Sequence, residues 1–384
     1  MSWSQHGADC LVVGGGLAGP MAALRLAAAG RDVLLVEKER GPHHKVCGEF
    51  LSPEAVHYLH AAGVDPAALG AEPIHRLRVS AGSRTVAVDL PFPALSLSRL
   101  ALDEALLARA VGQGCRILRG AAVESLAHVG GSWRALLADG AAIAADHAFL
   151  ATGKHDLRGW ARPPGRQNDL VGFKLHYRLV PVQVAALRGV MELFLFRGGY
   201  GGLSLVESGV ANLCLVVRRA ELRRFGGWPQ LMRSLLGKDC ALRQRIEGAQ
   251  PMWERPLAIS SIPYGYLARR QQADEPQLWP VGDQIAVIPS FTGDGMSIAL
   301  HSATLAAESF LAGETPAEYR QKLVAQLQRG MTLATGLSRL MVTSAGRSLA
   351  PPVLAMAPGI LRSIALRTRI PAPTLLAAAQ ETKA

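Results

Sequence analysis

The stretch that decides the fold lies near the N-terminus and reads DCLVVGGGLAGPMAALRLAAAGRDVLLVE, residues 9–37. It begins with an apolar run of strand length, residues 9–13, which leads into three glycines. Residues 17–29 then have the composition of a helix, and residues 32–37 form a second apolar run of strand length. A strand, a glycine turn, a helix and a second strand in this order predict a βαβ unit with two parallel strands.

The glycines of this unit have the spacing G-x-G-x-x-G, with Gly14, Gly16 and Gly19 at the junction of strand and helix. The first glycine of such a turn allows the tight bend, the second lets a diphosphate approach the backbone, and the third lets the helix pack on the strand. The helix N-terminus supplies free N–H groups to the diphosphate. Glu37 ends the second strand, where an acid accepts ribose hydroxyl groups. The unit therefore predicts a dinucleotide site; a glycine-rich structural turn is the alternative.

Later segments combine an apolar strand or a helix with a glycine turn in the same way. They are residues 148–153, residues 277–283, and residues 293–295 before a helix predicted over 296–312. Together with the first motif, these segments resemble the FAD-dependent oxidoreductases of the group that unites aromatic hydroxylases, geranylgeranyl reductases and flavin-dependent halogenases. The resemblance covers about residues 8–312.

The resemblance implies an α/β fold with two domains of the glutathione reductase type. A Rossmann FAD-binding domain then carries an inserted substrate domain with an antiparallel sheet, and the C-terminal segment is helical. The expected boundaries are residues 1–75, 98–165 and 275–312 for the FAD-binding domain, 76–97 and 166–274 for the substrate domain, and 313–384 for the helical segment.

The resemblance also implies roles for individual residues. Asp283 is expected on the ribityl chain, the turn at residues 293–295 at the pyrimidine end of the flavin, and the backbone of Val123 at adenine. Arg99 resembles a cofactor-contacting arginine, with a solvated arginine at a helix start as the alternative. The full expected FAD set is Gly14, Gly16, Leu17, Ala18, Gly19, Glu37, Lys38, Lys45, Arg99, Val123, Thr152, Gly153, Gly282, Asp283, Gly293, Asp294, Gly295 and Met296.

Within the group, Lys45-Val46-Cys47-Gly48 looks like the K-x-C-G segment of geranylgeranyl reductases. In those enzymes the segment runs past the flavin ring, so Cys47 and Gly48 are the candidate catalytic residues. A glycine after the cysteine lets the backbone approach a planar ring. The alternative for Cys47 is a small buried hydrophobe. The W-x-W-x-I-P segment of the halogenases does not occur, which disfavours halogenation.

The middle of the chain has the pattern of an antiparallel sheet. Residues 173–179 alternate apolar and polar side chains, and further strands are expected over 191–196, 202–206 and 210–217, with the glycines of 198–202 as a turn. The aromatic side chains Phe173, Tyr177, Phe194 and Phe196 are expected to line a substrate cavity or to pack in the core. His176 falls on the polar face, where we expect it to be solvated.

Composition narrows the class of protein. The 384 residues are 49% hydrophobic and 18% charged, which excludes a disordered chain, and the net charge is +11. Five cysteines without C-x-x-C spacing predict neither a disulfide framework nor a metal site, so we expect a reducing, cytoplasmic location with at most a peripheral membrane contact. The basic excess lacks a nucleic-acid motif, and no nucleic acid is expected as a partner.

The expected activity is therefore FAD-dependent oxidation or reduction of a hydrophobic substrate of the lipid, isoprenoid or polyketide kind, with reduction of a C=C bond favoured. An NAD(P)H-dependent monooxygenase that hydroxylates or epoxidises is the second hypothesis. A non-enzymatic lipid carrier, as in the Rab escort proteins of the same fold, is the third. No second G-x-G-x-x-G follows a strand, so we expect electrons from transiently bound NADPH or NADH, or from a reductase or ferredoxin.

The C-terminal segment differs in charge from the rest of the chain. Residues 321–384 contain eight Lys or Arg residues and one acid, Glu381. Helices are expected over 315–329 and 332–344, followed by segments that prolines interrupt. We expect this segment to pack on the FAD-binding domain and to turn a basic, apolar face to an anionic membrane or an acidic carrier protein. A helical cap with solvated arginines is the alternative, and oligomeric state stays open.

Overall fold

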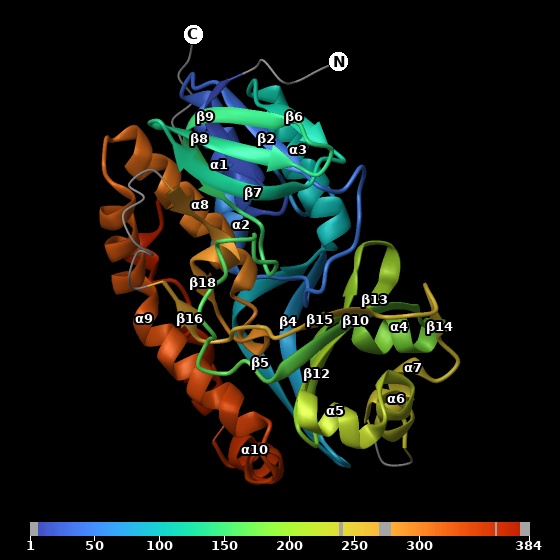
Figure 1. The fold of residues 1–384 in the computed structure, drawn as a ribbon. Helices are drawn as coiled ribbons and strands as arrows, with labels where there is room; N and C mark the ends of the chain where they lie inside the picture. Colours follow the sequence, from blue (N-terminus) through green and yellow to red (C-terminus); the bar gives the residue numbers. More distant parts are fainter. Residues whose placement is uncertain (1–6, 238–240, 269–277, 358, 377–384) are drawn as a thin grey trace.

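The fold is that of a computed structural model, which describes residues 7–237, 241–268, 278–357 and 359–376. Two sheets divide the described chain, one near the termini and one at the opposite end of the molecule (Figure 1). Helices from the C-terminal third run along one side of both sheets (Figure 1).

The first sheet confirms the βαβ unit. β1 pairs in parallel with β2 and with β9, and α1 crosses between the first two strands. The strand order is β6-β2-β1-β9-β8-β7, and β17 pairs in parallel with β9. Its strands are β1 Ala8–Val13, β2 Val33–Glu37, β6 Arg116–Arg119, β7 Val123–Val129, β8 Ser132–Leu137, β9 Ala142–Leu150 and β17 Leu278–Pro280. The helices that pack on it are α1 Ala18–Ala28, α3 Arg99–Gly112 and α8 Gly295–Leu311.

The second sheet has the order β14-β10-β13-β12-β11-β4-β5-β3, with β15 paired to β10. Its strands are β3 Phe50–Leu51, β4 Glu72–Ala81, β5 Arg84–Ser96, β10 Leu170–Arg178, β11 Gly189–Phe196, β12 Gly199–Val206, β13 Val210–Arg218, β14 Gln250–Pro251 and β15 Leu257–Ser260. Most pairs are antiparallel, whereas β11 and β4 run in parallel. β3 enters this sheet from within the segment 1–75 that was expected in the FAD-binding domain, and β4 begins four residues before the expected boundary at residue 76.

Two expectations about this sheet were wrong. The glycines of residues 199–202 lie inside β12, not in a turn, because Gly199 and Gly201 accept the close approach of Val216 and Leu215 from β13. The alternation in β10 does not separate a buried face from a solvated one, since eight of its nine residues are buried. Both faces of the sheet are therefore covered at β10.

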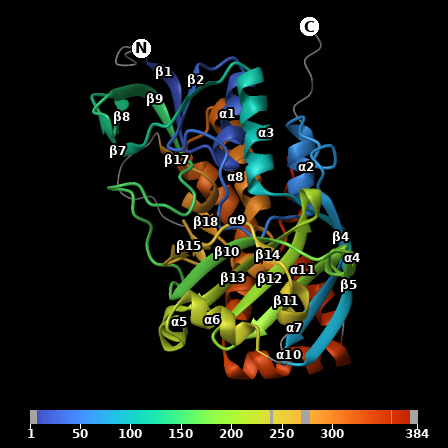
Figure 2. The same cartoon turned by 90° about the vertical axis from the view of Figure 1, so that its right-hand side faces the viewer.

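Small helices cover the outer face of the second sheet (Figure 2). Phe173 and Tyr177 point to this side and belong to an apolar cluster with Leu231 and Leu235, and the Phe173 ring lies 4.9 Å from that of Trp228. These helices are α4 Pro181–Leu187, α5 Arg219–Phe225, α6 Trp228–Leu235 and α7 Ala241–Ile246. Phe173 and Tyr177 are thus core residues on the face away from the glycine turns, whereas Phe194 and Phe196 line a small apolar pocket between the sheet and α6–α7.

The remaining helices join the two sheets. α9 is a single helix, Pro316–Met341, and replaces the two helices that were expected over 315–329 and 332–344. The helix continues through Gly330. A glycine suits this position because the backbone of Thr368 packs against it, where a side chain would be crowded. α9 begins with a capping box between Thr315 and Glu318. The other elements are α2 Pro53–Ala61, α10 Ser344–Met356, α11 Gly359–Arg367 and the two-residue strands β16 Tyr266–Leu267 and β18 Ala286–Val287.

Among the described residues, no single helix combines the length and the apolar composition that crossing a membrane requires.

Candidate functional site

The first glycine turn is built as a tight backbone crossing. A side chain at Gly14 would collide with the carbonyl oxygen of Ala151 after β9, and one at Gly19 would collide with the carbonyl oxygen of Gly14. Gly14 has φ = 112°, in the region that favours glycine. No side chain caps the N-terminus of α1, which begins after Leu17 with Ala18. The turn therefore fits the packing that a dinucleotide motif requires.

Glu37 is held under this turn. Its carboxylate accepts hydrogen bonds from the backbone N–H of Gly15 at 2.5 Å and of Glu39 at 2.9 Å. The side chain borders a cavity of about 230 Å³ that Lys45 and Arg119 also line. Glu37 thus presents an oriented carboxylate to a space beside the glycine turn, where an adenosine ribose is expected. Lys38 is exposed beside it and lies 3.9 Å from Glu39, and Val123 begins β7.

Two cations lie over the middle glycine. The Nη2 atom of Arg99 and the Nζ atom of Lys45 lie 3.4 and 3.7 Å from the position that a Cβ at Gly16 would take. Both cations bond to Asp103, Lys45 at 2.9 Å and Arg99 at 2.7 and 2.9 Å. Burial acts to lower the pKa of Arg99, but Asp103 raises it above its usual value. Two positive charges against one carboxylate suit a diphosphate at Gly16.

Arg99 is therefore not the solvated arginine of the alternative reading, since its side chain is 14% exposed. Ser98 caps α3 by accepting from the N–H of Ala101 at 3.1 Å, which fixes where Arg99 begins the helix. Sequence reasoning did not single out Asp103. The available signal was its position four residues after Arg99 on one helix face.

The segments after β9 and β17 meet at the same edge of the first sheet. Gly282, with φ = 62°, packs against Ala18 at the start of α1, and its N–H donates to Ser302 Oγ at 2.9 Å. The carbonyl oxygen of Asp283 accepts from Arg162 at 2.6 Å. The side chain of the next residue, Gln284, donates to the carbonyl oxygen of Gly153 at 2.8 Å. The backbone past Asp283 is thus tied to the segment Thr152–Gly153.

The second glycine turn, Gly293-Asp294-Gly295, stands at the start of α8, with Met296 buried behind it. Gly293 has φ = 75° and touches the Phe50 ring, whereas a side chain at Gly295 would meet open space. Asp294 is buried, and its carboxylate accepts from Arg369 Nη1 at 2.7 Å. Burial raises the pKa of Asp294 to about 7 against the opposing effect of Arg369. The side chain of Asp294 therefore holds the turn, and only its backbone is left to face a cofactor.

The segment of residues 45–49 passes between the two sheets. The Nζ atom of Lys154 donates to the carbonyl oxygen of Val46 at 2.7 Å, and Asn212 Nδ2 donates to that of Cys47 at 3.2 Å. The Cys47 thiol lies beside the Arg99 guanidinium and accepts from the N–H of Glu49 at 3.4 Å. Gly48 has no atom within 4 Å of its potential side chain, so it borders open space. Open space at Gly48 and at Gly295 fits the approach of a planar ring.

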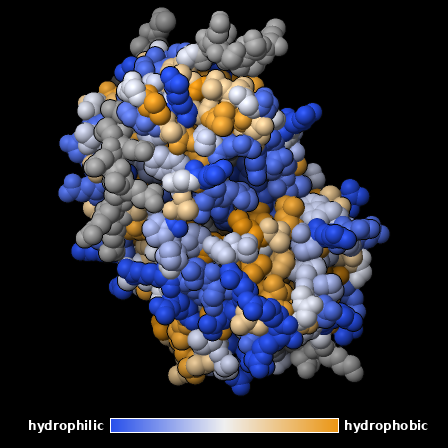
Figure 3. Space-filling view, viewed as in Figure 1, coloured by the Kyte–Doolittle hydropathy of each residue, from blue (hydrophilic) through white to orange (hydrophobic). Residues whose placement is uncertain are grey.

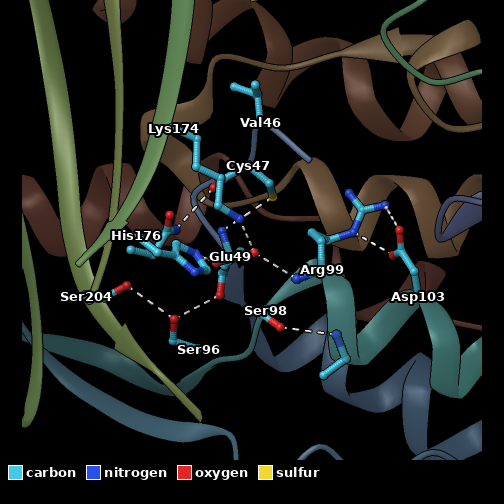
Figure 4. A network of polar contacts seen from close by, with 12 residues as sticks. Val46, Cys47, Glu49, Ser96, Ser98, Arg99, Asp103, Lys174, His176 and Ser204 are labelled. Carbon is cyan, nitrogen blue, oxygen red and sulfur yellow. Dashed lines mark hydrogen bonds and ion pairs between the residues drawn. The ribbon is translucent and has the colours of Figure 1, made fainter. Parts of the chain in front are cut away.

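A buried charged network, which we call the Glu49 network, lies on the sheet side of this segment (Figure 4). One oxygen of the Glu49 carboxylate binds the ammonium of Lys174 and the N–H of Arg99, and the other lies 2.9 Å from His176 Nε2. Glu49 and Lys174 are fully buried and His176 is 2% exposed. Their burial contradicts the expectation that His176 is solvated, because residues 44–49 cover the polar side of β10.

Glu49 has an unusual backbone conformation. Its φ is 58°, in the left-handed region that costs an L-residue about 1–2 kcal/mol. Its carbonyl oxygen accepts from Ser96 Oγ at 3.0 Å and from the N–H of Leu97 at 3.1 Å, so both ends of the residue are fixed. Such strain persists where the surroundings over-determine a functional conformation.

The surroundings of Glu49 and His44 shift the pKa of each side chain. Burial acts to raise the pKa of Glu49, but Lys174 and His176 outweigh it and lower the pKa, so Glu49 stays ionised. His44 packs edge-on to His176 with 4.7 Å between ring centroids, and Trp253 lies 4.9 Å from His44. Burial, Lys174 and His176 lower the pKa of His44 to about 4, so His44 is neutral at pH 7. Its Nδ1 atom is buried without a hydrogen-bond partner.

His44, Glu49 and His176 bring ligand-type atoms within 4.8 Å of one another. The ammonium of Lys174 already binds the Glu49 carboxylate, however, and its positive charge repels a cation at the same oxygen atoms. The arrangement therefore suits the holding and transfer of protons better than metal binding. Lys174 was not predicted as a site residue, because the alternation in β10 was taken to mean that one face of the strand is exposed to solvent. His44, which lies outside β10, was not predicted either.

Known proteins similar to this chain are FAD-binding proteins and reductases. Residues 7–147 match the family model of the FAD binding domain. Menaquinone reductase of Mycobacterium tuberculosis is 30% identical over 362 residues, which cover 87% of this chain and 84% of the relative. Digeranylgeranylglycerophospholipid reductase 2 of Methanopyrus kandleri is 29% identical, over 78% and 76% of the two chains. The structure of a flavin-dependent brominase superposes with a TM-score of 0.74 at 16% identity, covering 97% of each chain.

Proposed function

Because the chain belongs to the family of FAD-dependent oxidoreductases that includes menaquinone reductases and digeranylgeranylglycerophospholipid reductases, we propose that it reduces a carbon-carbon double bond in an isoprenoid-containing lipid. The observation that carries the proposal is the Glu49 network, a buried set of ionisable side chains beside the segment expected at the flavin ring. Reduction of a double bond requires a proton as well as a hydride, and this network can supply the proton.

The residues present fit FAD. The crossing at Gly14 and Gly19, the oriented carboxylate of Glu37 and the cations over Gly16 suit the adenosine and diphosphate parts. We propose that the open spaces at Gly48 and Gly295 receive the ring system. Reduced FAD, when bound, supplies the hydride.

We assign the proton to the His176 side chain. His176 Nε2 lies 2.9 Å from the ionised Glu49 carboxylate, which orients the imidazole. Lys174 balances the charge of Glu49, so the carboxylate and the ammonium together add no net charge beside His176. Neutral His44, packed edge-on to His176, has an unpartnered Nδ1 atom that can accept a hydrogen bond next to it. Proton donation by a positioned histidine is worth about 10²–10⁴-fold in rate.

The experiment uses the purified protein with FAD, reduced without oxygen and mixed with menaquinone or a geranylgeranyl lipid. The expected result is a product with two added hydrogens, and in D₂O both are deuterium, because the proton of the protein and the hydrogen that reduced FAD transfers both exchange with solvent. His176→Gln should lower kcat at least 100-fold. The matched control is His60→Gln, which changes an exposed histidine far along α2. A product that forms only with oxygen and contains an added oxygen atom would establish a monooxygenase instead.

The electron donor is part of the proposal. We propose NADPH or NADH as a transient donor, since the chain has one G-x-G-x-x-G turn and FAD fills it. Reduction of bound FAD by a nicotinamide in the absence of substrate tests this point. No reduction by either nucleotide would assign the electrons to a reductase or ferredoxin.

A further inference from the structure

Apolar side chains gather on the surface of the C-terminal helices. Twelve large hydrophobic side chains are exposed among the residues that the structure describes, and half of them lie between positions 340 and 366. These six are Leu340, Leu349, Val353, Met356, Ile360 and Leu366. Met356 is 87% exposed, more than any other of the twelve. Figure 3 shows apolar atoms at the end of the molecule where α10 lies in Figure 1.

The opposite side of the same helices is anchored. Leu354 of α10 is buried in a cluster with Val79, Tyr200 and Val342, and Leu361 of α11 packs against this cluster. The exposed side chains therefore project from a fixed surface, not from a frayed end. Monomeric proteins rarely leave a contiguous apolar surface of this kind without a partner.

The shape of the helix pair suits a surface location. Residues 344–356 and 359–374 together pass a length and hydropathy test for a membrane segment, but the two parts are bent by 111°. α10 alone has 13 residues and is about 20 Å long, shorter than the roughly 30 Å core of a bilayer. The pair can therefore lie in a membrane surface but not cross a membrane as one straight helix.

The charged residues that the C-terminal helices contribute to this surface have one sign. No acidic residue occurs between positions 319 and 376, whereas this stretch contains eight Lys or Arg residues. Arg339, Arg362 and Arg367 are exposed next to the apolar side chains, and Arg347 is half-buried. Arginines that flank exposed leucine, isoleucine and methionine complement an anionic lipid headgroup layer above an acyl layer.

We propose that α10, α11 and the end of α9 form a docking surface for an anionic lipid bilayer. Leu349, Val353, Met356 and Ile360 enter the acyl boundary, and the arginines contact the headgroups. Docking involves no residue of the Glu49 network or of the FAD site, so it holds whatever reaction the enzyme catalyses.

The test measures flotation of the full FAD-loaded chain with vesicles. Vesicles of phosphatidylcholine with phosphatidylglycerol should bind the wild type at least tenfold more strongly than phosphatidylcholine alone, and high salt should remove most of the difference. Leu349→Glu combined with Met356→Glu should lower binding at least tenfold. The matched control is Val182→Glu on α4, a side chain 68% exposed at another surface, which should bind like the wild type.

Thermal melting and the FAD spectrum show whether each variant is folded; if the double variant is not, Met356→Glu alone replaces it. Equal binding by wild type and the α10 variant would overturn the proposal. So would a wild type that does not float with anionic vesicles. Light scattering tests a second copy of the chain as the occupant: a dimer that the α10 substitutions dissociate, without vesicle binding by the wild type, would assign this surface to self-association.

Discussion

Neutralising Glu49 should expose the energetic cost of a buried charge. In Glu49→Gln the side chain keeps its shape, but the Lys174 ammonium stays fully buried without a counter-ion. Breaking a buried pair from one side costs about 3–5 kcal/mol of unfolding free energy. Lys174→Met should cost somewhat less, about 3 kcal/mol, because Glu49 keeps His176 and the N–H of Arg99 as partners.

The double variant Glu49→Gln, Lys174→Met removes both charges together. Replacement of a buried pair by neutral groups is often nearly neutral, so the double variant should lie within about 2 kcal/mol of the wild type. The two substitutions should therefore be strongly non-additive, with a coupling energy of about 3 kcal/mol or more.

The assay is urea unfolding followed by circular dichroism at pH 8, with FAD at one saturating concentration in every sample. Glu49→Gly serves as a control for the backbone strain. Both substitutions remove the carboxylate, but glycine also relieves the left-handed backbone by about 1–2 kcal/mol, so Glu49→Gly should cost less unfolding free energy than Glu49→Gln. Additive losses in the double variant, or a loss below 1 kcal/mol in either single variant, would refute the assignment of a buried, charged pair.

Three other substitutions test the remaining parts of the site. Glu37→Ala should raise the dissociation constant of FAD about 10- to 150-fold, by loss of an acceptor worth about 1.5–3 kcal/mol; isothermal titration measures this, and an unchanged constant would contradict the ribose role. Gly48→Val should lower FAD affinity at least tenfold by filling the open space there, whereas Gly336→Ala, at an open helix position, should not. Asp294 has a folded-state pKa raised from 3.8 to about 7, so its stabilising contribution is complete below about pH 4 and is lost as the pH rises through 7. The melting temperature of the wild type relative to Asp294→Asn should fall between about pH 4 and pH 7, and a constant difference over this range would be inconsistent with this titration.

The parts of the fold that local spacing determines were predictable. The βαβ unit follows from Gly14, Gly16, Gly19 and the strands around them, because a diphosphate turn requires these residues within a few positions of one another. Of the second sheet, only β10, β11, β12 and β13 were predicted from their residue patterns, whereas β3, β4, β5, β14 and β15 were not predicted as strands.

The Glu49 network was not predictable in this way. Alternation places Lys174 and His176 on one face of β10, but it cannot tell whether water or another segment covers that face. Here the cover is the segment that carries Glu49, which comes 125 positions before Lys174. A buried lysine next to a distant glutamate leaves no local pattern, since the pair forms only when the two sheets pack together.

The C-terminal helices show the same limit. The helix expected over 315–329 was predicted to end there, whereas α9 continues through Gly330, where the backbone of Thr368 packs against it. The next residue, Arg369, bonds to Asp294, 75 positions earlier in the chain. Such contacts depend on tertiary packing and not on the propensity of either segment.

The bond from Arg369 to Asp294 sets an order of events during synthesis. The glycine turn at residues 293–295 receives the buried counter-ion of Asp294 from a residue 75 positions later in the chain. The βαβ unit emerges from the ribosome first and can form early, because β1 and β2 pair with each other and α1 packs on them within residues 8–37. The turn at residues 293–295, by contrast, acquires this partner only after a further 75 residues have been synthesised. A chain that stops before Arg369 would keep its nucleotide-binding half and leave Asp294 buried without its cation.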